Sequence, residues 1–218
     1  MVILRATQRV LRSLRQAGGE VAVSDNALGD WYVNRLVIDR RPLLLLVSYA
    51  SRLAIVTPAR DVKGLPGRLA QIVGARLQRL GASGDVIASE IEATTHVCVG
   101  KTVDRSVTGQ LVDFAKALQY YLPVNRWDEA TLISAEDKLA ETPCRAGRPF
   151  AEVIWPRQRA IERLNTAWPA SRTRHCSRKV ALWSRATPMC LTRAGAAARR
   201  SEAARSDPDS TLKSAVAT

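Results

Sequence analysis

The sequence has little of the material from which catalytic and metal sites are usually built. It contains only two histidines, His96 and His175, which leaves almost no imidazole for general acid–base chemistry. The four cysteines are 46, 32 and 14 residues apart and so form no close pair of zinc ligands. His96 and Cys98 share a strand face, but no second pair of ligands accompanies them. Dinucleotide-binding, phosphate-loop and nucleophile-elbow patterns are also missing, and we predict no metal, no cofactor and no recognisable catalytic set.

Long hydrophobic runs are absent as well. The longest aliphatic run covers residues 43–47, whereas a helix that spans a bilayer needs about 20 apolar residues. No apolar segment with a small-residue cleavage site follows the N-terminus. We therefore expect a cytoplasmic protein without membrane contact, whose cysteines stay reduced.

Charge and apolar periodicity divide the chain into two parts. Hydrophobic residues make up 46% and charged residues 24% of the 218 residues, as in ordinary globular proteins. Of the net charge of +13, residues 1–164 carry +6 and residues 165–218 carry +7. Periodicity ends at Leu164, and Trp168 and the later apolar residues share no face. We predict one domain over 1–164 and a disordered basic tail over 165–218, which is either a nucleic-acid-binding arm or a frameshift-derived extension.

The periodicity of residues 1–164 predicts clusters of strands and clusters of helices. Strands are expected at 2–6, 31–38, 43–47, 53–57 and 95–101, and helices at 8–15, 65–80, 85–93, 106–122, 128–141 and 149–164, the last broken at Pro156. Because the strand at 43–47 is apolar on both faces, it should be central. We predict an α+β fold, in which a small, mostly antiparallel sheet, formed by a β-meander and one or two further strands, packs against several helices.

Charged side chains on the predicted helices are expected to face solvent. Arg68, Arg76 and Arg79 should lie opposite the leucine-rich face of their helix. The adjacent acids Glu136 and Asp137 should also be at the surface, as adjacent acids on helices usually are.

Three segments resemble a known family. They are LRATQRVL (residues 4–11), LGDWY (28–32) continuing to IDRR (38–41), and KTVDRSVTG (101–109) with Asp113. Together they resemble a bacterial domain family of unknown function, sometimes associated with plasmids or mobile elements, over about residues 1–122 and more weakly to 144. The family would have Met-Asn where this chain has Leu111 and Val112, so a polar role at Val112 is lost. Because the family has no established activity, the resemblance implies no chemistry.

The junction between the predicted strand 95–101 and the helix 106–122 is the first candidate site. A helix N-terminus offers unpaired N–H groups and about half a unit of positive charge, which suits an anion. The residues expected to surround such an anion are Lys101, Arg105, Ser106, Thr108 and Gly109. The alternative is that Ser106 only caps the helix. Arg105 would then pair with Asp104 or Asp113.

The predicted turn at 39–42 is the second candidate. Arg40 and Arg41 follow Asp39 there, and Trp31 and Tyr32 could supply an aromatic pair beside them, for base stacking with phosphate contacts. The alternative is that Trp31 packs in the core and the arginines only solvate a hairpin turn.

These residues support three hypotheses. The first is a non-enzymatic binding or accessory module that contacts nucleic acid, or another anionic partner, through residues 101–109 and the Arg40–Arg41 turn. The second is an enzyme of unknown reaction that brings Asp30, Asp104, Arg105 and Asp113 around one cleft. The third is a structural or protein-partner domain, whose polar motifs only hold turns and caps. We favour the first and the third.

Overall fold

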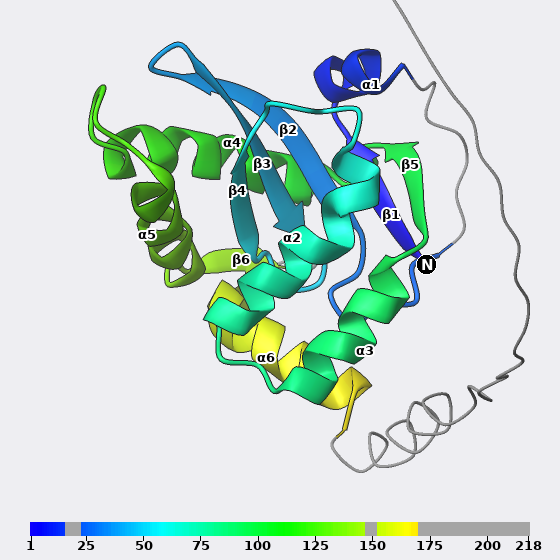
Figure 1. The fold of residues 1–218 in the computed structure, drawn as a ribbon. Coiled ribbons are helices and arrows are strands. Elements are labelled where there is room, and N and C mark those ends of the chain that lie inside the picture. Colours follow the sequence, from blue (N-terminus) through cyan, green and yellow to red (C-terminus); the bar gives the residue numbers. More distant parts are fainter. Residues whose placement is uncertain (16–22, 147–151, 170–218) are drawn as a thin grey trace, which may run out of the picture.

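A five-stranded sheet with helices on both faces forms the centre of the computed structural model, which describes residues 1–15, 23–146 and 152–169 (Figure 1). The strands are β1 (Val2–Ala6), β2 (Trp31–Ile38), β3 (Arg41–Ser48), β4 (Ala54–Pro58), β5 (Val97–Lys101), β6 (Cys144–Ala146) and β7 (Glu152–Ile154). The helices are α1 (Gln8–Leu14), α2 (Leu65–Arg79), α3 (Gly84–Thr94), α4 (Arg105–Tyr121), α5 (Glu129–Ala140) and α6 (Pro156–Ala167). Elements of both kinds cluster along the chain, which confirms the predicted α+β class.

The large sheet has the order β4-β3-β2-β1-β5. Strands β2, β3 and β4 form the predicted antiparallel meander. Strand β1 is parallel to both of its neighbours, β2 and β5, so the sheet is mixed and not mostly antiparallel as predicted. Strands β6 and β7, which the sequence pattern does not predict, pair with each other in a separate antiparallel sheet.

The hairpin between β2 and β3 is tighter than the predicted turn at 39–42. Ile38 pairs with Arg41, and the two residues between them, Asp39 and Arg40, have φ values of 49° and 61°. Two consecutive left-handed residues are typical of the type I′ turn, whose twist matches that of the flanking strands. Arg41 and Pro42 therefore belong to β3 instead of the turn.

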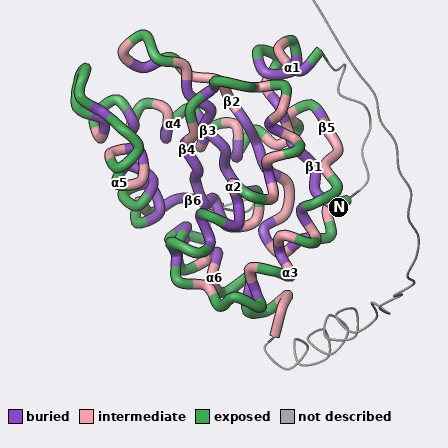
Figure 2. Tube along the Cα trace, viewed as in Figure 1, coloured by how far each residue is buried: buried purple, intermediate pink, exposed green. Residues whose placement is uncertain are grey.

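The core lies on both faces of the sheet, and β3 is buried on each of them (Figure 2). Leu44 and Leu46 pack with α1, α2, α3 and α6 on one face. Leu43, Leu45 and Val47 pack with α4 and α5 on the other. Burial of each such side chain contributes about 1.5–3 kcal/mol. As predicted for a strand covered on both faces, β3 is an interior strand, flanked by β2 and β4, but the central strand of the five is β2.

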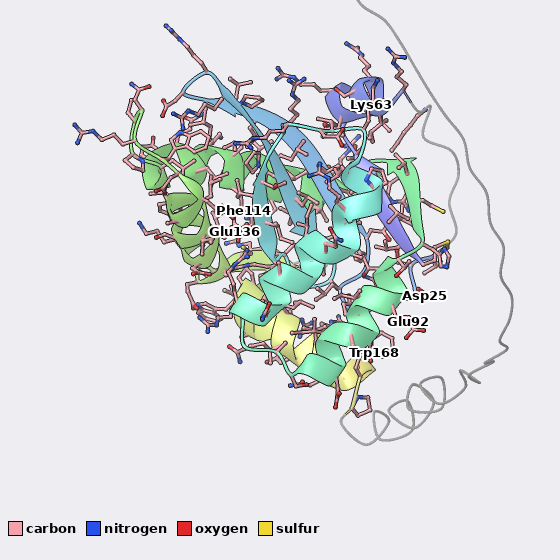
Figure 3. The ribbon with its side chains drawn as sticks, viewed as in Figure 1. Asp25, Lys63, Glu92, Phe114, Glu136 and Trp168 are labelled. Atoms are coloured by element: carbon pink, nitrogen blue, oxygen red, sulfur yellow. The ribbon has the colours of Figure 1, made fainter. Side chains whose placement is uncertain are left out.

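Two charged residues predicted at the surface are buried. Arg76 is 0% exposed and its Nη1 lies 2.6 Å from Asp137 Oδ1. Glu136 is 2% exposed; its Oε1 accepts from Val56 N at 2.7 Å and its Oε2 from Arg79 Nη2 at 2.5 Å (Figure 3). The prediction is wrong because Arg76 follows Val73 by three positions and so lies on the buried stripe of α2, where α5 supplies its acidic partners. The buried charges are tolerated since each is paired.

The ordered body continues past the predicted end of the domain. Pro156 lies in the first turn of α6, where it favours the helix instead of breaking it. Trp168 packs against the core, and its Nε1 donates to Oε2 of the buried Glu90 at 2.9 Å (Figure 3). Trp168 therefore belongs to the folded domain and not to the predicted tail. The predicted tail from residue 170 onward, with His175, lies outside the described residues. No helix within the described ranges is long and apolar enough to cross a membrane.

Candidate functional site

The three segments that resemble the family meet at one hollow on the α4 side of β1 and β2. This hollow has a volume of about 470 Å³. Its polar lining comes from Arg5, Ser24, Asp30, Tyr32 and Asp104, and Tyr49 forms one wall. We call it the motif pocket. Because the residues arrive from β1, the start of β2 and the start of α4, only the folded sheet brings them together.

Arg5 and Asp30 form an ion pair at the pocket. Their register explains it, since Arg5 lies beside Tyr32 in the parallel pair of β1 and β2. Arg5 Nε is 2.7 Å from Asp30 Oδ2, and Ser24 Oγ donates to Asp30 Oδ1 at 2.5 Å. Both carboxylate oxygens of Asp30 are therefore engaged, in a geometry that fixes the loop before β2 onto β1.

The N-cap of α4 is Asp104, not Ser106 as predicted. Asp104 Oδ1 accepts from Ser106 N at 2.7 Å and from Val107 N at 3.3 Å. Thr108 Oγ1 donates to Asp104 O at 2.8 Å. A carboxylate both accepts strongly and complements the helix dipole, so aspartate takes the cap. The N–H groups on which the predicted anion site depends are thus occupied by the chain's own carboxylate.

The other residues predicted around that junction spread over the surface. Lys101, Arg105 and Gly109 are exposed. Asp113 is exposed on α4 and is not part of the lining of the motif pocket. Among the described residues, Arg105 forms no ion pair with Asp104 or Asp113, so the predicted pairing is wrong.

Arg52, Tyr49 and Tyr32 form a stack behind the pocket that the sequence pattern did not indicate. Arg52 is 3% exposed, with a left-handed φ of 61°, and its Nη2 donates to Ser106 Oγ at 3.1 Å. Its guanidinium lies 5.7 Å from the ring centre of Tyr49, which lies 6.5 Å from that of Tyr32. Burial lowers the pKa of Arg52, and the Asp104 carboxylate opposes that shift. The stack thus ties the β3–β4 turn to the start of α4.

Asp39, Arg40 and Arg41 lie at the far end of β2 from Asp30. An eight-residue strand spans about 25 Å, so Asp30 and Asp39 do not line one pocket. Trp31 is fully buried, as the core alternative predicts. The aromatic residue beside the arginines is Trp127, which the sequence reasoning missed. Asp39 Oδ2 accepts from Trp127 Nε1 at 3.2 Å and so holds this tryptophan in place.

A larger groove of about 720 Å³ is lined by residues of α2, α5 and the edge strand β4. Figure 1 shows β4 between these two helices. Four arginines line it: Arg41, Arg60, Arg68 and Arg79. We call it the arginine groove. The guanidinium of Arg41 lies 4.9 Å from the ring centre of Trp127, and its Nη1 donates to Trp127 O at 2.9 Å. Sequence spacing offers no sign of the groove, because its arginines come from a strand, a loop and a helix.

The acids of the groove are Asp128, Glu129 and Glu136. Glu136 is bonded to Val56 and Arg79, as described above. Asp128 caps α5 and accepts from Thr131 N at 2.9 Å, and these hydrogen bonds lower the pKa of Asp128. Two of the three acids are therefore committed to internal bonds. The oxygens of these two acids are therefore less available as hydrogen-bond acceptors than the arginine N–H groups are as donors.

Those cysteine and histidine residues that the structure describes, His96, Cys98 and Cys144, do not assemble into a site. In the described part of the chain, no group of three or more His, Cys, Asp or Glu side chains could hold a metal ion. His96 is exposed and precedes β5, and Cys98 Sγ lies 3.7 Å from Met1 Sδ. Burial raises the pKa of Cys144 to about 11, so Cys144 is a thiol at neutral pH.

Comparison with known proteins gives one match. A family model described as "Domain of unknown function (DUF6933)" matches residues 3–159. The match includes every residue that lines the motif pocket and the arginine groove. No curated protein and no solved structure matches the chain.

Proposed function

The chain belongs to the DUF6933 family of domains of unknown function, and we propose that it is a non-enzymatic binding module that holds nucleic acid in the arginine groove. The proposal keeps the Arg40–Arg41 region of the sequence hypothesis. It drops the helix junction at 101–109, because Asp104 already occupies the backbone donors there.

The imbalance between arginines and acids in the groove carries the proposal. Each guanidinium has several N–H donors, and the internal bonds of the groove use few of them. Arg41 Nη1 donates to Trp127 O, and Arg68 Nη2 donates to Asp61 O at 2.5 Å. Arg60 is exposed. The remaining donors suit the oxygens of successive phosphates, which arginine binds with two parallel hydrogen bonds.

Exposed basic residues outside the groove add to its positive charge. They are Arg40 at the hairpin tip, Lys63 before α2 and Arg126 before α5. Residues 1–164 carry a net charge of +6. Such a field increases the rate at which a polyanion associates. The +7 charge of residues 165–218 strengthens this attraction but does not determine where on the protein the nucleic acid binds.

The enzyme hypothesis has one observation in its favour, since Asp30 and Asp104 do line the same pocket. Both oxygens of Asp30 are engaged, however, by Arg5 and Ser24. One carboxylate oxygen of Asp104 accepts the hydrogen bonds that cap α4. Carboxylates held in this way position the backbone more readily than they transfer protons, which favours the binding module.

The test is a salt titration of the full chain with fluorescently labelled single-stranded RNA and with duplex DNA, read by anisotropy. We expect binding at low salt that weakens linearly on a log–log plot as salt rises. Replacing Arg60 and Arg68 together by glutamine removes two phosphate contacts. This should weaken binding and reduce the magnitude of the salt slope by about 1.5.

The control is the double change Arg145→Gln with Arg163→Gln. It removes the same charge from exposed positions on β6 and α6, away from the groove. Both variants keep residues 165–218, so a contribution from that basic segment is the same in each. Equal losses in the two variants would mean that the groove is not the binding site, and no binding at low salt would end the nucleic-acid proposal.

A further inference from the structure

The motif pocket has an apolar rim that nucleic-acid binding in the arginine groove does not explain. Val23, Val103 and Tyr49 are 88%, 67% and 47% exposed, and all three border the pocket. The buried side chain of Ile3 lies on its floor. Apolar side chains are costly to leave in water, and a rim of them around a hollow with a few convergent polar groups is typical of a ligand site.

The pocket carries little net charge. The Arg5 guanidinium is 2.7 Å from the Asp30 carboxylate and balances it. The Asp104 carboxylate is balanced by the N-terminus of α4, which it caps, and by the neighbouring Arg52. A free phosphate would meet the two carboxylates, and a cation would meet the two arginines. The balance therefore favours a neutral ligand.

Tyr49 supplies a flat wall. Its ring has two neighbours, the buried Arg52 guanidinium at 5.7 Å and the ring of Tyr32 at 6.5 Å, which is inclined to it by only 23°. A ring held by such neighbours loses little conformational entropy when a ligand stacks against its exposed part. Flat aromatic ligands gain most from such a wall.

A hydrogen-bond donor and an acceptor lie side by side at the pocket. Tyr32 Oη accepts from Asp104 N at 3.2 Å, which leaves the hydroxyl proton for a ligand. Burial raises the pKa of Tyr32, so that proton is present at neutral pH. Asp104 uses Oδ1 for the helix cap, and Oδ2 makes no hydrogen bond within the described residues. The pair matches the edge of a heterocycle that presents an acceptor beside an N–H donor.

We propose that the motif pocket binds a neutral planar nitrogen heterocycle of the nucleobase class, stacked on Tyr49 and hydrogen-bonded by Tyr32 and Asp104. This site is separate from the arginine groove, because the groove lies along β4 and the pocket lies over β1 and β2. The two proposals can therefore fail independently.

The probes are adenosine, guanosine, cytidine and uridine, which have a base but no phosphate and so do not depend on the groove. Binding to the full chain is measured by saturation-transfer NMR and by calorimetry. We expect saturable binding of at least one nucleoside. Tyr49→Ala should weaken it by about 5- to 100-fold, the usual effect of removing a stacking ring. Tyr49→Phe, which keeps the ring, should retain it.

The matched control is Tyr120→Ala, which removes a tyrosine that is 86% exposed on α4 and lies outside the pocket. Asp104→Asn adds a second variant that keeps a good N-cap but replaces an acceptor oxygen by an amide donor. It should weaken the preferred nucleoside more than the others. Absence of saturable binding by all four nucleosides, or equal losses for Tyr49→Ala and Tyr120→Ala, would overturn the proposal.

Discussion

The motif pocket and the arginine groove are two hollows that are built in opposite ways. In the pocket, each charged group faces a partner: Arg5 faces Asp30, and Asp104 faces the start of α4. In the groove, Asp128 and Glu136 are committed to internal bonds, while the arginines keep donors that the groove itself does not use. The pocket is thus preorganised and nearly neutral, whereas the groove presents positively charged hydrogen-bond donors.

The two hollows also differ in how their lining residues are distributed along the sequence. Apart from Ser24, the polar lining of the pocket comes from short segments at 4–11, 28–32 and 101–109, each of which is recognisable in the sequence. The groove gathers side chains from position 41 to position 136. Motifs therefore mark the hollow whose parts are locally encoded, and they miss the hollow that arises only when α2 and α5 pack beside β4.

We expect the largest effect on the free energy of unfolding from Glu136→Ala, a change in the wall of the arginine groove. This change leaves the buried Arg76 with only Asp137 as a carboxylate partner and removes the acceptor for Val56 N. Breaking a buried ion network of this kind should lower the free energy of unfolding by about 3 kcal/mol. Urea denaturation measures the loss.

Glu129→Ala is the control for this change, since Glu129 lies on the same helix and in the same groove but is exposed. It should alter the free energy of unfolding by less than about 0.5 kcal/mol. If Glu136→Ala costs no more than Glu129→Ala, the groove wall does not depend on the buried network.

The sequence pattern predicted the secondary structure better than the pairing of charges. The leucine run at 43–47 identified an interior strand, because a strand covered on both faces is apolar throughout. Period alone does not tell which strand lies beside which, so the parallel addition of β1 between β2 and β5 was not foreseen. Strands β6 and β7, with three residues each, are too short to show alternation.

The errors concern polar residues that act over long distances. Arg76 lies on the buried stripe of α2, and its carboxylate partner Asp137 comes from α5, 61 positions away. Trp168 looks isolated because its partner, Glu90, lies 78 positions away. Asp104 and Ser106 are both good cap residues, and the choice between them depends on Arg52 and Tyr32, which contact this junction from other strands and turns. Local sequence patterns do not predict such contacts between distant residues.

A smaller effect is expected at the pocket, from Asp30→Asn. The amide keeps the shape of the carboxylate but leaves the Arg5 guanidinium without its counter-charge. The free energy of unfolding should fall by about 1.5 kcal/mol, at the low end for hydrogen bonds to charged groups because both side chains retain some exposure. Glu92→Gln, an exposed acid on α3, is the control. A nucleic-acid affinity that drops with Asp30→Asn in the folded protein would contradict the separation of the two hollows.

The smallest effect concerns acid and the cap of α5. Hydrogen bonds from Thr131 lower the pKa of Asp128 below its ordinary value of 3.8. A carboxylate whose pKa is lower in the folded chain contributes stability above the unfolded value, and that contribution disappears as the pH falls through the folded value. The difference in free energy of unfolding between the parent chain and Asp128→Ala should therefore be constant near neutral pH and shrink below pH 3.8. Urea denaturation over a pH series measures it, with Glu129→Ala, which removes an adjacent acid that does not cap the helix, as the reference. A difference that grows as the pH falls would show that Asp128 is ionised at a cost in the folded protein, and the groove would then contain one more uncommitted acid than the structure indicates.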